Sequence, residues 1–477
     1  RLRIGKVPQR GASDRTIAPS LQSSASTSLL CNGNGACHNY DLDDRMCPSW
    51  KATRDRRYTP KGRAGLMREW VTRLSDQGVQ TIPSLSIGEH ILGAPARILR
   101  TWKKSDANYD FNHEVFESMS TCLACKSCTG QCPIKVSVPT FRSHFLSAYY
   151  TRYSRPMKDW IVGTLEYALP IAAQVPKLYN LLVESRLGRG LFSMLGLVDS
   201  PSLSGIDPHR AIAEAGFQVA DTSRLLAMKD SDPERFSRQV VVVQDAFTSY
   251  FETNAVVDLF ELLKLLDFEP TLMPFHANGK PLHVHGFLKW FKRLGESNAE
   301  KLRAIDAIGV PMIGLDPSMT MTYRSEYQEA HIETPPVLLV QEFIATHLVE
   351  GAIATTLPVK RFRLFAHCTE ATNAKESLAL WKPIFAMAGQ SLEIESVGCC
   401  GMAGTYGHEK ANVETSQTIY AQSWKPKVEA QTQSDGEILA TGYSCRSQVK
   451  RFSNQTMRHP VSALRVILAS AASQQPA

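Results

Sequence analysis

Four cysteines followed by a proline restrict what this chain can fold into more than any other feature. Cys122, Cys125, Cys128 and Cys132-Pro133 have the spacing C-x2-C-x2-C-x3-C-P, with which one short turn and helix present thiolates to a [4Fe-4S] cluster. Structural zinc sites instead pair two cysteine dyads and do not use a four-cysteine run that ends in proline. The run therefore predicts an iron–sulfur cluster and a role in electron transfer.

A second group of cysteines precedes this run. It consists of Cys31, Cys37 and Cys47, and Pro48 follows directly. Cys31 and Cys37 are six positions apart, as are Cys122 and Cys128. In two-cluster ferredoxins the proline-marked fourth cysteine of one motif usually ligates the other cluster, so a single motif needs a partner. We interpret the earlier group as that partner.

Length and composition limit the class of protein. A chain of 477 residues is too long for one hydrophobic core and predicts about three domains. Apolar residues make up 43% and charged residues 21%, and no apolar run approaches the roughly 18 residues of a membrane span. The 11 cysteines, an odd number at metal-like spacings, favour a reducing cytoplasm over a disulfide-linked secreted fold. A formal charge of +7 does not require a nucleic-acid partner.

The predicted fold is multidomain. We expect an α-helical ferredoxin-like domain over residues 29–150, a helical connector over 151–234 and two α/β cysteine-rich repeats over 235–345 and 346–477, the first of them degenerate. Residues 1–28 are polar and rich in Ser and Thr, and they are expected to be a linker or the cut edge of a missing flavin domain.

Two segments leave alternatives open. Six basic residues lie between the cysteine groups: Lys51, Arg54, Arg56, Arg57, Lys61 and Arg63. They predict either a solvated loop that neutralises cluster charge, which we favour, or a docking surface for an acidic partner or nucleotide phosphate. In the connector, Trp160, Tyr167 and Tyr179 fit aromatic core packing better than contact with a membrane surface.

Beyond residue 235 strands alternate with helices. The first repeat is expected to contain strands at 240–243 and 270–274 and a helix at 254–266. The second is expected to contain strands at 362–365, 392–396 and 437–440 and a helix at 374–388 that is interrupted at Pro383. Each repeat then forms a small parallel sheet whose ligand-binding loops meet at the carboxyl ends of the strands.

The second repeat places Cys368, Cys399-Cys400-Gly401 and Cys445 just past its strands. The corresponding positions of the first repeat are Ala246, Ala277-Asn278-Gly279 and Met319, and both repeats separate the first two positions by 31 residues. We infer that the chain duplicated and that one copy kept its thiols. The four thiols predict an iron–sulfur cluster or zinc, with a redox thiol pair or structural cysteines as alternatives. His367 is left out of the ligand set, because a lone histidine is more often a core residue.

Six stretches resemble one family. They are C-N-G-N-G-A-C from Cys31, R-M-C-P-S-W from Arg45, P-K-G-R from Pro60, C-L-A-C-K-S-C-T-G-Q-C-P-I from Cys122, V-G-C-C-G-M-A-G-T-Y-G-H-E from Val397 and A-T-G-Y-S-C-R-S-Q-V-K-R from Ala440. From Leu29 onward the chain resembles the C-terminal iron–sulfur half of large bacterial FAD-dependent D-2-hydroxyglutarate dehydrogenases. It is more distantly similar to the glycolate oxidase iron–sulfur subunit and to cysteine-rich subunits of heterodisulfide reductase and anaerobic glycerol-3-phosphate dehydrogenase.

The resemblance implies an electron-transfer unit that takes electrons from reduced FAD and passes them through clusters to a quinone, flavoprotein or soluble carrier. The FAD is expected on a missing half or partner, because no Gly-rich dinucleotide fingerprint occurs here. A non-catalytic iron–sulfur module and a heterodisulfide reductase-like thiol redox protein centred on Cys399 and Cys400 stay as alternatives. Cytoplasmic location, peripheral contact with the inner membrane and oligomer formation are further expectations.

One position departs from the relatives, whose first motif reads C-x2-C-x2-C, because Asn34 replaces the middle cysteine. If the fourth cysteines are exchanged, Cys47 completes the ligand set of Cys122, Cys125 and Cys128. The other set is then three thiolates with Asn34: Cys31, Cys37 and Cys132. A [3Fe-4S] cluster, a [4Fe-4S] cluster with an oxygen or water ligand, or no cluster at all are the alternatives there.

Overall fold

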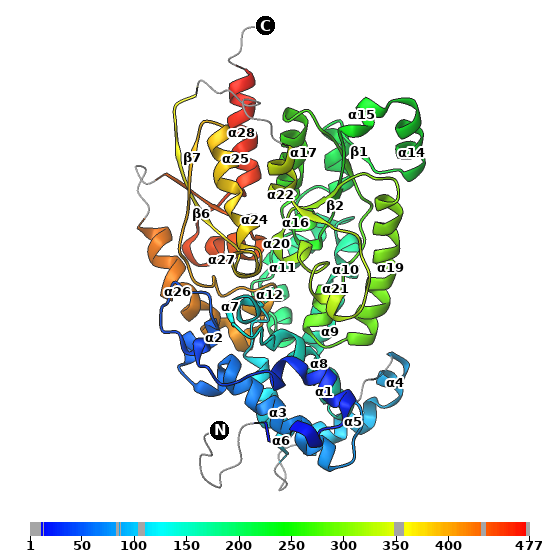
Figure 1. The fold of residues 1–477 in the computed structure, drawn as a ribbon, viewed down its shortest axis with the longest axis vertical. Helices are drawn as coiled ribbons and strands as arrows, with labels where there is room; N and C mark the ends of the chain where they lie inside the picture. Colours follow the sequence, from blue (N-terminus) through cyan, green and yellow to red (C-terminus); the bar gives the residue numbers. More distant parts are fainter. Residues whose placement is uncertain are drawn as a thin grey trace, which may run out of the picture.

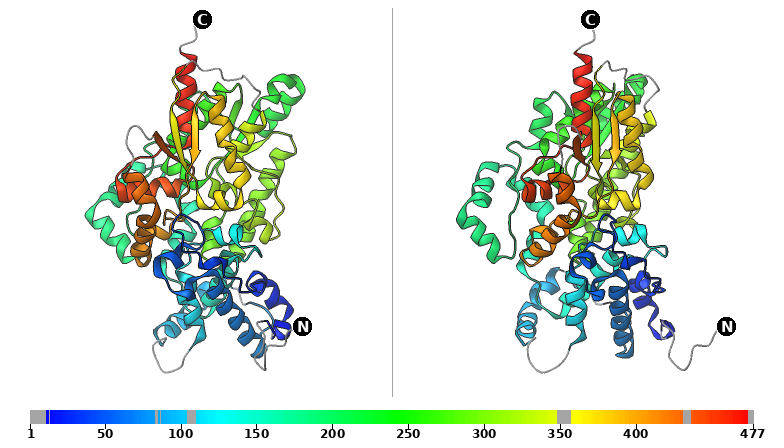
Figure 2. Two further views of the ribbon diagram at one scale, coloured as in Figure 1. Left: turned by 60° about the vertical axis from the view of Figure 1, so that its left-hand side comes forward. Right: turned by 90° about the vertical axis from the view of Figure 1, so that its left-hand side faces the viewer.

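The computed structural model describes residues 11–12, 14–82, 85, 87–103, 110–347, 357–430 and 436–473. A helical N-terminal unit, blue to cyan in Figure 1, carries two parallel sheets above it. Figure 2 shows the same division from two other sides.

The N-terminal unit is built from helices and short 3-10 turns. Its helices are α1 Pro19–Leu29, α2 Pro48–Thr53, α3 Pro60–Asp76, α4 Ile87–Leu92, α5 Ala94–Trp102, α6 Phe111–Ser120, α7 Ser127–Gln131 and α8 Val138–Arg152, and its 3-10 turns are η1 Asp14–Thr16, η2 Ala36–His38 and η3 Arg56–Tyr58. Five of the eight α-helices carry proline in their first turn, where the missing N–H has no helical partner to lose.

The expectation of a linker over residues 1–28 is wrong where those residues are described. Helix α1 packs on α3 and α8, and Leu21 and Ala25 are fully buried. Their spacing of four places both on one helix face, while the Ser and Thr residues that suggested a linker lie mostly on the other faces. Residues 1–10 and 13 lie outside the described part.

The basic segment is not a solvated loop throughout. Lys51 is 3% and Arg63 1% exposed, because α2 and α3 fold these two side chains inward, whereas Arg54, Arg56 and Arg57 stay exposed. The prediction of a loop was wrong, since α2 runs into the segment and Pro60 starts a second helix inside it.

The connector consists of short helices, as expected, and adds a strand. Its elements are α9 Met157–Gly163, α10 Leu165–Ala172, α11 Pro176–Glu184, α12 Arg186–Met194, α13 Pro208–Glu214, β1 Gln218–Val219, α14 Thr222–Ser231 and α15 Pro233–Ser237. Strand β1 pairs with a strand of the first sheet, so this sheet begins before the boundary predicted at 235.

The aromatic side chains of the connector pack on protein, as we favoured. Trp160 lies against Phe287 with ring centroids 5.0 Å apart, and Tyr167 stacks on Trp290 at 5.6 Å. Tyr179 joins a small buried cluster. Among the described helices, none is long and apolar enough to cross a lipid bilayer.

The first sheet has five parallel strands in the order β1-β3-β2-β4-β5. The predicted strands at 240–243 and 270–274 and the predicted helix at 254–266 are present as β2, β3 and α17. The elements from residue 239 are β2 Gln239–Val243, α16 Ala246–Phe251, α17 Thr253–Leu265, β3 Glu269–Leu272, α18 Lys280–Val284, α19 Leu288–Asp306, β4 Met312–Gly314, α20 Pro317–Thr320, α21 Glu326–Glu329, β5 Leu338–Leu339 and α22 Val340–His347. The boundary predicted after 345 falls inside α22.

The second sheet has three parallel strands in the order β7-β6-β8. All three predicted strands are present, and the order repeats that of β3-β2-β4, which supports the inferred duplication. The elements are β6 Arg361–Phe365, α23 Cys368–Asn373, α24 Lys375–Ala379, α25 Trp381–Met387, β7 Ser391–Ile394, η5 Tyr406–His408, η6 Lys410–Asn412, α26 Val413–Glu429, β8 Glu437–Ala440, α27 Tyr443–Ser453 and α28 Pro460–Ala472.

The helix expected at 374–388 breaks at Leu380 rather than at Pro383. Pro383 is the third residue of α25, and proline is tolerated in the first turn of a helix. The expected position of the break was therefore wrong by three residues.

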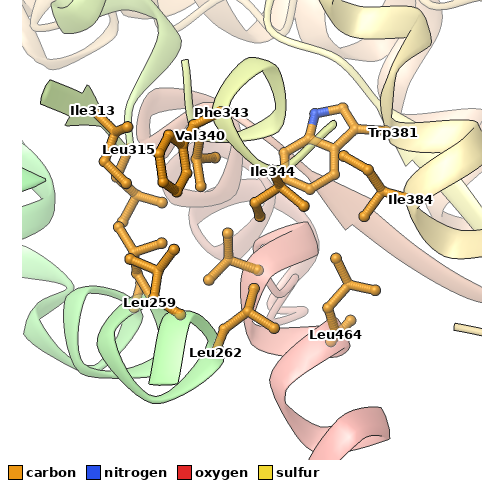
Figure 3. Packing of buried hydrophobic residues seen from close by; sticks show 14 of the residues in the cluster. Leu259, Leu262, Ile313, Leu315, Val340, Phe343, Ile344, Trp381, Ile384 and Leu464 are labelled. Atoms are coloured by element: carbon orange, nitrogen blue, oxygen red, sulfur yellow. The ribbon is translucent and has the colours of Figure 1, made fainter. Parts of the chain in front are cut away.

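The two repeats share one hydrophobic core. Leu259 of α17 and Phe343 of α22 belong to the same buried cluster as Trp381 of α25 and Leu464 of α28, and Figure 3 shows these side chains converging between the helices. Helix α28 packs along α17 of the other repeat. The repeats are thus held side by side, and both direct the carboxyl ends of their strands toward the N-terminal unit.

Candidate functional site

The N-terminal unit brings one predicted ligand set together. Cys47, Cys122, Cys125 and Cys128 line a single cavity, although Cys47 comes from the other motif. Cys47 directly precedes α2, Cys122 and Cys125 lie on the loop that enters α7, and Cys128 is the second residue of α7. The predicted exchange of the fourth cysteine therefore agrees with the placement of the side chains.

The loop that carries these thiols is strained. Ala124 has φ 54° and Lys126 φ 55°, both in the left-handed region that residues with a Cβ rarely adopt. Such residues persist where the surroundings fix them, and they concentrate at functional sites. Here the two left-handed residues alternate with cysteines, and Cys122, Cys125 and Cys128 face the same cavity.

Two buried cations flank this cavity. The Arg63 guanidinium donates to the Ser118 carbonyl at 2.9 Å and lies 3.7 Å from the Cys47 sulfur. Lys126 forms ion pairs with Glu326 at 3.3 Å and Glu329 at 3.1 Å. Burial raises the pKa of Cys47, and the Arg63 charge opposes that shift. The sequence placed Arg63 in a solvated segment and gave Lys126 no role, since a buried cation looks the same in sequence as an exposed one.

The other N-terminal set also surrounds one cavity. Cys31, Cys37 and Cys132 line it together with Asn34. The Asn34 side-chain oxygen accepts the Ala36 N–H at 2.9 Å, and its amide group donates to Asn32 at 3.0 Å. The side chain that replaces a cysteine thus stabilises its own turn.

The second repeat gathers its four thiols at the carboxyl ends of its strands. Cys368 starts α23 after β6, Cys399 and Cys400 follow β7, and Cys445 lies in α27 after β8. Neighbouring side chains interact in the order Cys368, Cys399, Cys400, Cys445 and shift one another's pKa. The Gly401 N–H donates to the Cys399 sulfur at 3.3 Å. The predicted convergence of the thiols is confirmed.

Gly401 is required by this turn. Its φ is +87°, and a Cβ at this position would lie 2.4 Å from the Ser416 carbonyl oxygen. Gly279 occupies the matching position of the first repeat with φ +80°. Both repeats therefore keep the same left-handed turn where only glycine fits easily.

His367 is a helix cap, which agrees with leaving it out of the ligand set. Its Nδ1 accepts the Thr369 N–H at 3.2 Å at the start of α23. Burial lowers the pKa of His367 to about 4, so the ring is neutral near pH 7.

The first repeat holds a carboxyl group where the second holds thiols. Glu166 of α10 accepts the N–H groups of Asn278 at 3.2 Å and Gly279 at 2.8 Å. Burial raises the pKa of Glu166 to about 7. The sequence indicated that this repeat had lost its thiols, but it gave no sign that a connector helix fills the position.

Glu166→Gln should change how stability depends on pH. The pKa of Glu166 is about 7 in the folded chain and near 4.5 when unfolded, so the wild type loses stability as pH rises through that interval. Gln cannot ionise. The free energy of unfolding of Glu166→Gln, taken relative to that of wild type, should therefore rise by about 3 kcal/mol between pH 4.5 and pH 7. Denaturant unfolding at pH 5 and pH 8 measures this, with exposed Glu184→Gln as the control. The same change in the free energy of unfolding between pH 5 and pH 8 for wild type and Glu166→Gln would contradict this prediction.

A contact that the sequence did not predict joins the N-terminal unit to the second repeat. Cys125 packs against Cys368, and the interaction between the two side chains, followed by burial, raises the pKa of Cys125 well above its ordinary value. The Thr369 hydroxyl donates to the Cys125 carbonyl at 3.2 Å, and Asn373 donates to that of Lys126 at 3.3 Å. Five thiols thus form one continuous series across the interface.

A larger, partly open cavity lies beside this contact. Its wall includes Cys122, Cys125 and Cys368, and the first repeat contributes Lys280 and Asp316. Concave sites with apolar walls and a few polar groups are where small ligands usually bind. A small molecule in this cavity would lie next to two of the thiol sets.

A site for a single metal ion needs several ligand side chains that converge on one point. Within the described residues, no three His, Cys, Asp or Glu side chains converge closely enough to hold one ion. The two N-terminal thiol sets instead surround cavities, an arrangement suited to a group larger than one ion. All 11 cysteines lie in the described part, and each carries a free thiol.

Comparisons with known proteins agree with the motif resemblance. The chain is 46% identical over 465 residues to the D-2-hydroxyglutarate dehydrogenase of Pseudomonas putida and 42% identical over 470 residues to that of Escherichia coli. Each alignment covers 96% of this chain and 45% of the relative, so the chain spans about half their length. It is also 27% identical over 251 residues, 49% of this chain and 60% of the relative, to a subunit of the Escherichia coli anaerobic glycerol-3-phosphate dehydrogenase. No family model and no solved structure matches the chain.

Proposed function

We propose that this chain is the iron–sulfur electron-transfer portion of an FAD-dependent D-2-hydroxy acid dehydrogenase, with D-2-hydroxyglutarate as the substrate of the flavin-containing half. The names of the relatives support the dehydrogenase. The observation that carries the electron-transfer role is the series of thiol sets, in which Cys47 completes the set at Cys122, Cys125 and Cys128 while Cys125 contacts Cys368.

The residues present fit clusters at three places. Cys47, Cys122, Cys125 and Cys128 would hold a [4Fe-4S] cluster as four thiolates. Three thiolates beside Asn34 would hold a second cluster: Cys31, Cys37 and Cys132. The four thiols of the second repeat would hold a third cluster: Cys368, Cys399, Cys400 and Cys445. When bound, iron–sulfur clusters supply one-electron chemistry that can divide the electron pair of a reduced flavin.

The protein's contribution is to exclude water and set the charge around these thiolates. Arg63 places a buried guanidinium beside Cys47, and the Lys126 side chain anchors the α7 loop to two carboxylates of the first repeat. Hydrogen bonds and charges around the sulfurs tune reduction potential. The hydrogen bonds from Thr369 and Asn373 to the backbone carbonyls of Cys125 and Lys126 hold Cys125 beside Cys368.

The acceptor is proposed to approach through the larger cavity, since Cys125 and Cys368 line it. A thiol–disulfide reductase centred on Cys399 and Cys400 is less well supported. These two side chains are 4% and 3% exposed and are not among the residues that line the cavity, so a disulfide substrate could not reach them without rearrangement.

The function is tested by separating the chain from its proposed flavin half. The anaerobically reconstituted chain, free of flavin, should not oxidise D-2-hydroxyglutarate with an artificial dye, because clusters cannot accept a hydride. Adding the flavin half with substrate should then reduce the chain, seen as loss of visible cluster absorbance. Substrate turnover by the flavin-free chain would refute the division of labour, and a chain that stays oxidised beside a substrate-reduced flavin half would refute the electron route.

A further inference from the structure

Arg45 carries buried donors with no acceptor. Its Nε and Nη2 atoms are shielded from solvent, and no atom of the described residues accepts a hydrogen bond from either. A buried donor left unpaired costs about 1–3 kcal/mol, and more when charged. Such a side chain needs an explanation, and Arg45 lies in the N-terminal motif R-M-C-P, two residues before Cys47.

The loop that carries Arg45 is fixed against the thiols of the second repeat. The Leu42 carbonyl oxygen packs so closely on Gly398 that a Cβ there would lie 2.4 Å from it, and Gly398 directly precedes Cys399. Asp43 accepts from Ser423 at 2.7 Å and pairs with Lys427 at 2.6 Å. These contacts hold the loop over the turn that bears Cys399 and Cys400.

The acidic groups that face Arg45 already have other donors. Asp44 accepts from Gln131 at 2.7 Å and pairs with Lys51 at 3.6 Å. Glu370 accepts from Gln341 at 2.8 Å and from Thr441 at 2.5 Å. The remaining groups that act on the Arg45 charge are the sulfurs of Cys368 and Cys445, which act on it more strongly than either carboxylate.

We propose that Arg45 compensates the negative charge of a thiolate-bound group at Cys368, Cys399, Cys400 and Cys445 and donates its two orphaned N–H groups to that group. The inference rests on the proposed function, since it requires a cluster or thiolate-bound metal there. Neutral, inert thiols would not offset the cost of burying a guanidinium. A nearby cation stabilises the reduced, more negative state, so Arg45 is a positioning residue that raises the reduction potential of the site.

Redox titration of the full chain tests this, with the C-terminal centre followed by EPR after anaerobic reconstitution. Arg45→Met should make reduction of that centre about tenfold less favourable, which lowers its reduction potential by about 59 mV for one electron. The reduction potential of Arg45→Lys should lie between those of Arg45→Met and wild type. Arg56→Met, which removes an exposed arginine of the same unit, should leave the potential unchanged. Equal potentials for wild type and Arg45→Met would overturn the inference.

Metal content separates this inference from the proposed function. If Arg45→Met releases the group bound at the C-terminal thiols, Arg45→Lys should retain that group and Arg45→Gln should lose it, because the positive charge holds it. Equal metal content in Arg45→Lys and Arg45→Gln would overturn the inference. A wild-type chain with iron at the N-terminal cavities and no metal at the C-terminal thiols would overturn it while leaving the N-terminal electron route intact. A chain that binds no iron anywhere would overturn both.

Discussion

Gly130→Val should separate the two cysteine-bearing parts of the chain. A Cβ at Gly130 of α7 would lie 2.2 Å from the Thr372 carbonyl oxygen and 2.5 Å from its carbonyl carbon, and these backbone atoms of α23 cannot move without shifting Cys368. Overpacking of this kind costs about 1–3 kcal/mol, which lowers the ratio of docked to undocked chains roughly 5- to 150-fold. Electron passage from Cys125 to Cys368 should fall with it.

The measurement is the rate at which the C-terminal centre is reduced after the N-terminal clusters, followed by rapid-freeze EPR in the reconstituted chain. Gly65→Val is the matched control, because no described atom lies within 4 Å of a Cβ built there. Iron content should be unchanged in both variants. An unchanged inter-site rate in Gly130→Val would show that the α7–α23 contact is not the electron route.

Local spacing made much of the fold and of the thiol sets predictable. Strands such as 240–243 and 437–440 are short apolar runs bounded by turn residues, and their side-chain pattern suffices to identify them. The exchange of Cys47 into the set around Cys125 follows the pattern of two-cluster ferredoxins, in which the proline-marked cysteine of one motif usually ligates the other cluster. The convergence at Cys368 and Cys445 follows because parallel strands end at the same edge of a sheet.

The contact between Cys125 and Cys368 could not be predicted in the same way. It depends on how α7 docks on α23, helices separated by more than half the chain, and on the close approach that Gly130 allows. From the sequence, the N-terminal unit and the second repeat were predicted as separate domains. The shared core of the repeats was missed for the same reason, since periodicity shows which face of a helix is buried and not what covers it.

The sequence also did not predict which charged side chains are buried. Arg63, Lys126 and Glu166 belong to residue types that are almost always exposed unless paired, so a sequence pattern assigns them to the surface. Their partners come from distant segments: Lys126 pairs with Glu326, and Glu166 binds the backbone of Asn278. Arg45 was likewise seen as part of a motif without a role of its own.

Cys125→Ala should remove the cluster proposed at the first cavity. The change takes away one of four converging thiolates, and the Ala side chain has no atom that could bind iron in its place. We expect the anaerobically reconstituted variant to bind about four fewer iron ions per chain than wild type. Cys37→Ala, which removes a thiol from the other N-terminal cavity, is the matched comparison and should leave the first cluster in place.

Iron and sulfide content together with the reduced-state EPR spectrum of these three proteins test the electron-transfer role most directly. The structure predicts that wild type shows the signal of the first cluster, that Cys37→Ala keeps it, and that Cys125→Ala loses both the signal and its iron. A folded Cys125→Ala chain with full iron content and the wild-type spectrum would contradict the proposed cluster and, with it, the route from flavin to Cys368.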